Sequence, residues 1–128
     1  MKELPRISEA EWEIMKLIWK KNPITSDEII TPLSSKMGWT AQTIKTFINR
    51  LLKKEVIRFE KSGRNYLYYP ILTEKECIKA ENKSFLEKVY NGAIGMLVSN
   101  FLEDEALSEK DIEYLQQLLN SRKKGQSE

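Results

Sequence analysis

The spacing of apolar residues changes at Glu55. In the stretch 39–55 they recur at i, i+3, i+4, i+7 and i+8, the spacing of one face of an α-helix. They are Ile44, Phe47, Ile48, Leu51 and Leu52. Beyond Glu55, the segments 56–60 and 65–69 alternate apolar and polar residues, and a polar turn at 61–64 separates them. The sequence therefore predicts a helix followed directly by a β-hairpin.

The opposite face of the predicted helix is polar and basic. It carries Gln42, Lys45, Thr46, Asn49 and Lys53, with Arg50 and Lys54 on the flank and Thr40 at the helix cap. A helix that enters the DNA major groove needs an apolar back to seat it and hydrogen-bonding and cationic side chains in front. By itself such a face is also typical of an ordinary solvated helix.

Two further helices precede this one. Ser8 and Glu11 form the pattern of a capping box that opens a helix through Lys21, and Thr25 and Glu28 form a second. The first helix has a wide apolar stripe in which Trp12 and Trp19 are expected to be core residues. Asn22-Pro23 ends it, and Ile24 is expected to lie in a short strand or a bridging loop.

The second helix has Ile29, Ile30, Leu33 and Met37 as inner residues. Pro32 predicts a kink or an early end, because proline removes a helical hydrogen bond and clashes with the preceding turn. Gly38 ends the element. Two helices joined by a short turn that contains glycine, followed by a hairpin, form a winged helix-turn-helix. Lys61 and Arg64 at the hairpin tip are suited to contact phosphates, although an ordinary polar turn has the same composition.

The C-terminal part reads as a helical arm. Thr73 and Glu76 cap a helix through about Tyr90, whose charged part, 75–83, is expected to be a solvated spacer, and Asn91-Gly92 interrupts it. Two amphipathic helices follow, the second after Ser108. Three short helices have too little interior to be stable alone, so a second copy of the chain is the simplest partner. The expected dimerisation residues are Phe85, Leu86, Val89, Tyr90, Ile94, Leu97, Val98, Phe101, Leu102, Ile112, Leu115 and Leu119.

Charge and composition restrict the function. Residues 1–72 hold 13 Lys/Arg and 8 Asp/Glu, a net of +5, whereas 73–128 hold 8 and 11, a net of −3. A polyanion would therefore be drawn to the N-terminal part. No apolar run is long enough to span a membrane and no signal peptide is evident, so we expect a cytoplasmic protein without direct membrane binding.

An enzyme is disfavoured by the residue inventory. The chain has no histidine, a single cysteine and no glycine-rich phosphate loop, so no nucleophile–base pair, cofactor or metal site is expected. A protein-interaction adaptor remains an alternative, since winged helices also bind proteins.

Nearly the whole chain resembles the penicillinase-repressor family, the regulators of β-lactamase and methicillin-resistance genes. The resemblance is carried by Ser8-Glu9-Ala10-Glu11-Trp12, Trp19, Thr43-Ile44, Thr46, Arg50-Leu51, Lys53-Lys54, Tyr68, Phe85-Leu86, Val89-Tyr90-Asn91-Gly92 and Leu97-Val98-Ser99-Asn100-Phe101-Leu102-Glu103. Copper-responsive relatives carry a C-terminal cysteine cluster that this chain lacks, so metal sensing is not expected.

The resemblance implies a homodimeric repressor on an inverted-repeat operator in double-stranded DNA. The residues that it and the helix pattern assign to DNA are Thr40, Ala41, Gln42, Thr43, Lys45, Thr46, Asn49, Arg50, Lys53, Lys54, Lys61 and Arg64. It also implies inactivation by cleavage between Asn100 and Phe101, carried out by a membrane sensor-transducer with a zinc-protease domain. Ala41, Gln42 and Lys45 depart from the usual pattern, so the preferred operator is expected to differ from that of relatives.

Together these observations predict a mainly α protein with a small β-hairpin. The expected organisation is a winged helix-turn-helix DNA-binding domain at 1–72, a helical dimerisation domain at 73–121 and a disordered tail at 122–128. A winged-helix regulator of unrelated genes, without proteolytic induction, is the alternative within the DNA-binding class.

Overall fold

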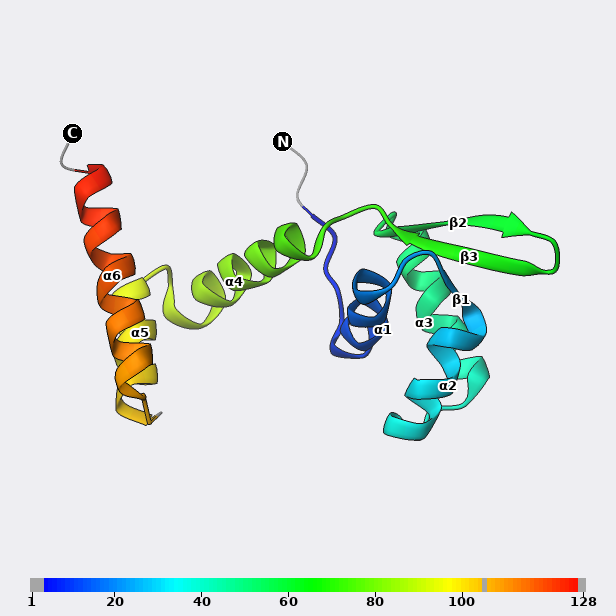
Figure 1. Cartoon of the computed structure of the whole chain (residues 1–128), viewed down its shortest axis with the longest axis horizontal. Coiled ribbons are helices and arrows are strands. Elements are labelled where there is room, and N and C mark those ends of the chain that lie inside the picture. Colours follow the sequence, from blue (N-terminus) through cyan, green and yellow to red (C-terminus); the bar gives the residue numbers. More distant parts are fainter. Residues whose placement is uncertain (1–3, 105, 127–128) are drawn as a thin grey trace. The chain divides into compact units, whose positions relative to one another are not determined.

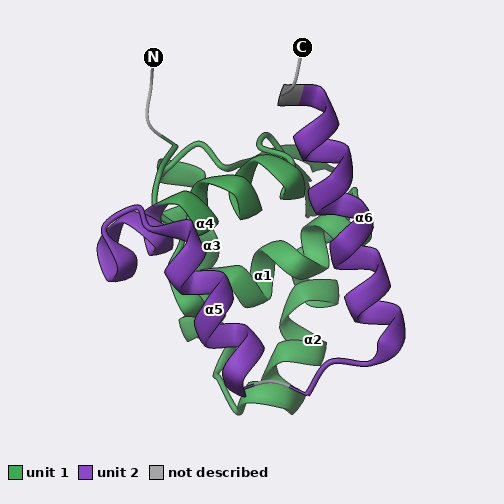
Figure 2. Cartoon of the chain, turned by 90° about the vertical axis from the view of Figure 1, so that its left-hand side faces the viewer, with its two compact units in different colours: residues 1–83 green, residues 84–128 purple. Residues whose placement is uncertain are grey.

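The computed structural model describes residues 4–104 and 106–126, in two compact units comprising residues 1–83 and 84–128 (Figures 1 and 2). The elements in chain order are α1 (Glu9–Lys20), β1 (Ile24–Thr25), α2 (Ser26–Met37), α3 (Ala41–Lys53), β2 (Ile57–Ser62), β3 (Asn65–Pro70), α4 (Glu74–Tyr90), α5 (Ile94–Asp104) and α6 (Glu109–Gln126). Within the described ranges, no helix has both the length and the apolar character needed to cross a membrane.

All three predicted capping boxes are present. In the first, the Ser8 N–H donates to Glu11 Oε1 at 2.8 Å, and the Glu11 N–H donates to Ser8 Oγ at 3.2 Å. The same reciprocal pair links Thr25 with Glu28, and the third links residues 73 and 76. Each box satisfies two N–H groups that a helix start otherwise leaves unpaired, so these helix starts are set by residues three positions apart.

Helix α2 does not end at Pro32. It continues to Met37, and Gly38 closes it in the left-handed conformation with φ of 71°. Ile29 and Leu33, on either side of the proline, are both buried in the core. Their burial offsets the hydrogen bond that Pro32 cannot donate, which explains why the expected early end does not occur.

The sheet has three antiparallel strands in the order β1-β3-β2, so the predicted hairpin gains a third strand. Ile24 pairs with Tyr68, and Phe59 pairs with Tyr68 from the other side. The hairpin formed by β2 and β3, called the wing below, turns at Gly63, where φ is 62°. The sheet therefore joins the chain before α2 to the strands after α3.

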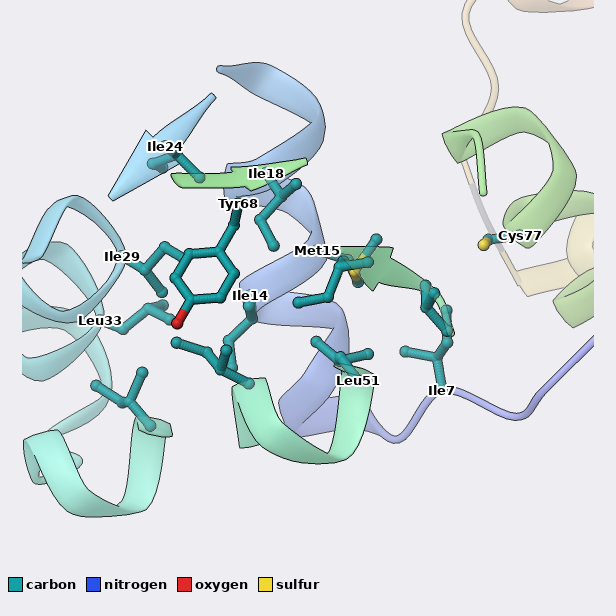
Figure 3. Close-up of a cluster of buried hydrophobic side chains, with 14 residues drawn as sticks. Ile7, Ile14, Met15, Ile18, Ile24, Ile29, Leu33, Leu51, Tyr68 and Cys77 are labelled. Atoms are coloured by element: carbon teal, nitrogen blue, oxygen red, sulfur yellow. The ribbon is translucent and has the colours of Figure 1, made fainter. Parts of the chain in front are cut away.

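One hydrophobic core, within residues 1–83, lies between α1, α2, α3 and the sheet (Figure 3). Ile14, Met15 and Ile18 of α1 are fully buried in it, and the ring of Tyr68 points toward Ile29 and Leu33. Trp12 and Trp19 pack against this core and are half-buried. The Trp19 Nε1–H donates to the Leu72 carbonyl at 3.0 Å, which ties the end of the wing to α1.

The boundary between the units lies eleven residues beyond the predicted one, at 83 instead of 72. The reason is Cys77, on the first half of α4, which is buried in the core of residues 1–83. Burial and the neighbouring Glu76 raise the pKa of the Cys77 thiol. The rest of the charged segment 75–83 is exposed or half-buried, as expected for a spacer.

Helix α6 continues to Gln126, so residues 122–126 are helical in this structure, where the sequence analysis expects a disordered tail. Lys123 and Lys124 lie in its last turn, where cations interact favourably with the helix dipole. Residues 127 and 128 lie outside the described part of the chain. Helix α6 also begins with a reciprocal cap between Ser108 and Asp111.

Candidate nucleic-acid interface

The face of α3 that the sequence assigns to DNA is exposed. The apolar residues Ile44, Ile48 and Leu51 are buried on its reverse side. The exposed predicted residues are Thr40, Ala41, Gln42, Lys45, Asn49, Arg50 and Lys53, while Thr43 and Thr46 are half-buried. The core therefore holds α3 by one side and presents the other.

The hydroxyl groups at the start of α3 are used within the helix. Thr40 Oγ1 accepts from the Thr43 N–H at 3.1 Å as the cap, and Thr46 Oγ1 donates to the Gln42 carbonyl at 3.0 Å. The Gln42 amide and the Lys45 ammonium make no hydrogen bond with any described group. These two side chains are thus the ones at this end of α3 whose polar atoms are available to bases.

The basic residues of the segment 36–64 divide into paired and unpaired groups. Lys36, Lys54 and Arg58 each form an ion pair with a glutamate. Among the described residues, no carboxylate lies within 4.0 Å of the other five, which are Lys45, Arg50, Lys53, Lys61 and Arg64. All five lie on α3 or at the wing tip. The positive charge left for a polyanion is therefore concentrated on the predicted interface.

Lys54 is not part of that group, because its ammonium is paired within the chain, and its predicted DNA contact stays a prediction. Its Nζ donates to Glu11 Oε1 at 2.6 Å and to the Arg6 carbonyl at 2.7 Å. Glu11 is only 1% exposed, so removing Lys54 from it would leave a buried carboxylate short of a cation. The Lys54 ammonium therefore joins the end of α3 to α1 and to the preceding segment.

The protonation state of Glu11 follows from this pairing. Burial alone would raise the pKa of Glu11, but the hydrogen bonds from Lys54 and from the Ser8 N–H, together with the Lys54 charge, hold it below its ordinary value. Glu11 is therefore a carboxylate at neutral pH.

The wing carries the remaining predicted contacts at its tip. Lys61 and Arg64 are both exposed there. Nearer its base, the Arg58 guanidinium lies 4.2 Å from the centroid of the Tyr69 ring and pairs with Glu60 at 3.0 Å. The Arg58 charge is therefore paired within the wing, whereas Lys61 and Arg64 at the tip have no carboxylate partner among the described residues.

A polar hollow of about 390 Å³ opens between the start of α2, the outer face of α3 and the wing. It brings together three predicted site residues, Lys45, Asn49 and Arg64. It also brings in Ser26, Asp27 and Tyr68, which the sequence analysis does not assign to the site. Nothing in the local sequence distinguishes Ser26 and Asp27 from an ordinary helix start, and only the pairing of β1 with β3 places them beside Tyr68.

The predicted dimerisation residues all belong to residues 84–128. Leu86, Tyr90 and Leu97 are half-buried, and the other nine are exposed. Ile94 is 63% exposed and Leu119 is 69% exposed.

The predicted scissile bond lies inside α5, where the Asn100 amide donates to the Tyr90 hydroxyl at 3.1 Å. Among the described residues, no cluster of His, Cys, Asp or Glu could hold a metal ion.

The sequence model of the penicillinase repressor family matches residues 7–121, which is most of the chain. The chain belongs to the penicillinase repressor family. This match confirms the family that the sequence analysis assigned by resemblance. The proteins of this family are DNA-binding transcriptional repressors, not enzymes.

Curated relatives cover the chain almost completely. The chain is 41% identical over 128 residues to the penicillinase repressor of Bacillus licheniformis, which covers 100% of both chains. It is 39% identical over 116 residues to the methicillin resistance regulatory protein MecI of Staphylococcus aureus (strain N315), which covers 91% of this chain and 94% of the relative.

Solved structures of the family confirm the winged-helix fold. The solution structure of the DNA-binding domain of the repressor BlaI is 42% identical, covers 59% of this chain and 93% of its own, and has a TM-score of 0.54. Monomeric Bacillus licheniformis BlaI in complex with the blaP half-operator is also 42% identical over the same shares, with a TM-score of 0.53. This second structure is a relative of the chain solved with operator DNA bound.

Proposed function

We propose that this chain is a homodimeric repressor of β-lactamase or related antibiotic-resistance genes, and that it binds an inverted-repeat operator. The observation that carries the proposal is the distribution of unpaired cations, which lie on α3 and the wing tip while the other basic residues of that segment are ion-paired. The complex of the relative BlaI with the blaP half-operator supports binding to operator DNA. Gln42 and Lys45 would read bases, and Lys53, Lys61 and Arg64 would contact phosphates.

The apolar surface of residues 84–128 supports dimerisation. Among the described residues of this unit none is buried, and twelve large apolar side chains are exposed on the end of α4 and on α5 and α6. An isolated monomer rarely exposes so large an apolar surface, and a second copy of the chain would cover it. Two linked DNA-binding units would bind paired half-sites far more tightly than one, because the second binds at high effective concentration.

Cleavage between Asn100 and Phe101 would reverse this gain. Seven of the twelve exposed apolar residues follow Asn100 in the chain, so the cut would remove most of the surface available for pairing. The fragment ending at Asn100 would retain residues 1–83 and their core. Repression would then end through loss of pairing, with the DNA-binding unit intact. A membrane sensor-transducer with a zinc-protease domain is the proposed protease.

Two measurements test the proposal. The purified chain is used to select duplexes from a random library, and its mass is measured by sedimentation at the binding concentration. We expect a dimer on an inverted repeat; a stable monomer, or binding that ignores sequence, contradicts the proposal. For the cleavage step, Asn100→Asp and Phe101→Ala should retain operator binding yet resist induction by a β-lactam in cells. Normal induction in either strain contradicts the assigned bond.

A further inference from the structure

The polar hollow contains more hydrogen-bond donors than the chain itself uses. Ser26 Oγ and the Tyr68 hydroxyl lie 3.5 Å apart and share one hydrogen bond, so one O–H hydrogen of the pair has no acceptor among the described residues. Tyr68 is only 7% exposed as a residue and lines the hollow, so this O–H belongs to a side chain that is largely removed from solvent. A buried donor of this kind is normally satisfied by a partner.

The start of α2 adds backbone donors. Its capping box uses the N–H groups of Thr25 and Glu28, and leaves those of Ser26 and Asp27 without an acceptor in the described chain. The Lys45 ammonium and the Arg64 guanidinium, from α3 and the wing tip, line the same hollow without a carboxylate partner within 4.0 Å. Hydroxyl, N–H and cationic donors from three elements therefore converge on one space.

Such a donor set fits a small anion with several acceptor oxygens. We propose that the hollow seats one phosphodiester group of the DNA, where the strand passes between the groove entered by α3 and the groove contacted by the wing. This inference rests on the proposed function, and it adds Ser26 and Tyr68 to the DNA contacts. A helix start favours a phosphate through its free N–H groups and its dipole, and the two cations add charge.

Asp27 opposes the phosphate in the same hollow. It is exposed in the first turn of α2, and its carboxylate forms no ion pair with a described residue. A phosphate seated here would be repelled by it, so the seat includes a charge that limits DNA affinity. At about 0.1 M salt, one such interaction across a partly exposed site corresponds to roughly a three- to ten-fold change in affinity.

The experiment uses the full chain and a duplex that it selects from a random library. Each backbone phosphate of one half-site is replaced in turn by an uncharged methylphosphonate, and the affinity of every duplex is measured by fluorescence anisotropy. The variants are Asp27→Asn and Tyr68→Phe. Tyr69→Phe serves as the matched control, because Tyr69 is the next residue of β3 and faces the other side of the sheet.

We expect Asp27→Asn to tighten binding about three- to ten-fold. This gain is expected to disappear when one particular phosphate of the half-site is replaced by a methylphosphonate. Tyr68→Phe is expected to weaken binding by about three- to ten-fold through loss of a hydrogen bond to a charged group, with the effect lost at the same phosphate. Tyr69→Phe is expected to show neither effect. The negative charge of Asp27 stabilises the first turn of α2, so replacing it by Asn lowers the stability of the helix. Tighter binding by this variant therefore cannot arise from a more stable fold.

The outcomes separate this inference from the proposed function. If Asp27→Asn gives no gain in DNA affinity, or a gain that persists whichever phosphate is neutralised, the phosphate seat is overturned and the proposed function is not. Failure of the wild-type chain to select any duplex overturns both proposals. If the hollow takes free phosphate and not the DNA backbone, the Asp27→Asn and Tyr68→Phe effects would not disappear at any neutralised phosphate of the half-site, and inorganic phosphate at constant ionic strength would leave DNA affinity unchanged. That combination would also overturn the seat.

Discussion

The pairing of Lys54 with Glu11 gives a prediction that separates a structural role from a DNA contact. Lys54→Met keeps the length of the side chain and removes the ammonium that lies 2.6 Å from Glu11 Oε1. The buried carboxylate then keeps only its hydrogen bonds with Ser8. Breaking a buried ion pair costs about 3–5 kcal/mol. Because the Lys54 side chain is 33% exposed and water can replace part of its effect, we expect a loss of about 2 kcal/mol of unfolding free energy.

The pH dependence provides a second criterion. In the wild type the folded-state pKa of Glu11 lies below its ordinary value, so its contribution to stability is present above about pH 4.3 and is lost as the pH falls through the folded-state pKa. Without Lys54, the hydrogen bond and the charge that lower the pKa of Glu11 are lost, so the pKa rises from its wild-type value and burial of the carboxylate is less well offset. The destabilisation by Lys54→Met is therefore expected to be larger at pH 7 than at pH 4.

Urea unfolding followed by tryptophan fluorescence measures this effect, because all three tryptophans lie within residues 1–83. Glu11→Gln in combination with Lys54→Met is expected to recover part of the loss, since no buried charge remains. A destabilisation below about 0.5 kcal/mol, the range of ordinary surface substitutions, or one of equal size at both pH values, would refute the structural role. So would a salt dependence of DNA binding that flattens in Lys54→Met as it does for a phosphate contact.

Three further outcomes follow from the structure. Lys53→Ala is expected to flatten the slope of log affinity against log salt by about 0.9 without changing stability, as measured by anisotropy in a salt series. Trp19→Phe removes the hydrogen bond to the Leu72 carbonyl and is expected to cost about 1 kcal/mol, measured by denaturant unfolding followed by circular dichroism; an unchanged midpoint contradicts this. Ile94→Lys places a charge in the exposed apolar surface and is expected to lower the dimer fraction in sedimentation, whereas the conservative Ile94→Val leaves it unchanged.

The features that the sequence predicts well depend on residues close together in the chain. The capping boxes at Ser8, Thr25 and Thr73 each involve a partner three positions away, and the helical stripe of α3 lies within a few turns. The glycine that ends α2 is likewise a local signal. Local patterns of this kind are sufficient to give the winged-helix order of elements.

The features that the sequence analysis missed depend on distant partners. Lys54 has the composition of a DNA contact, and only its approach to Glu11, 43 positions away, gives it another role. Ser26 enters the site because β1 pairs with β3, which a two-residue strand does not reveal. The length of α2 beyond Pro32 is decided by burial on both sides of the proline.

The two units differ in what holds them together, and this has a consequence for the cell. Residues 1–83 contain the buried core, while the described residues of 84–128 include no buried side chain. If the arm orders itself against a second copy, its stability rises with the amount of repressor present, whereas that of the first unit does not. Under the proposed function, a fall in repressor level would then loosen residues 84–128 first, and repression would respond to dilution of the protein in addition to the proposed cleavage.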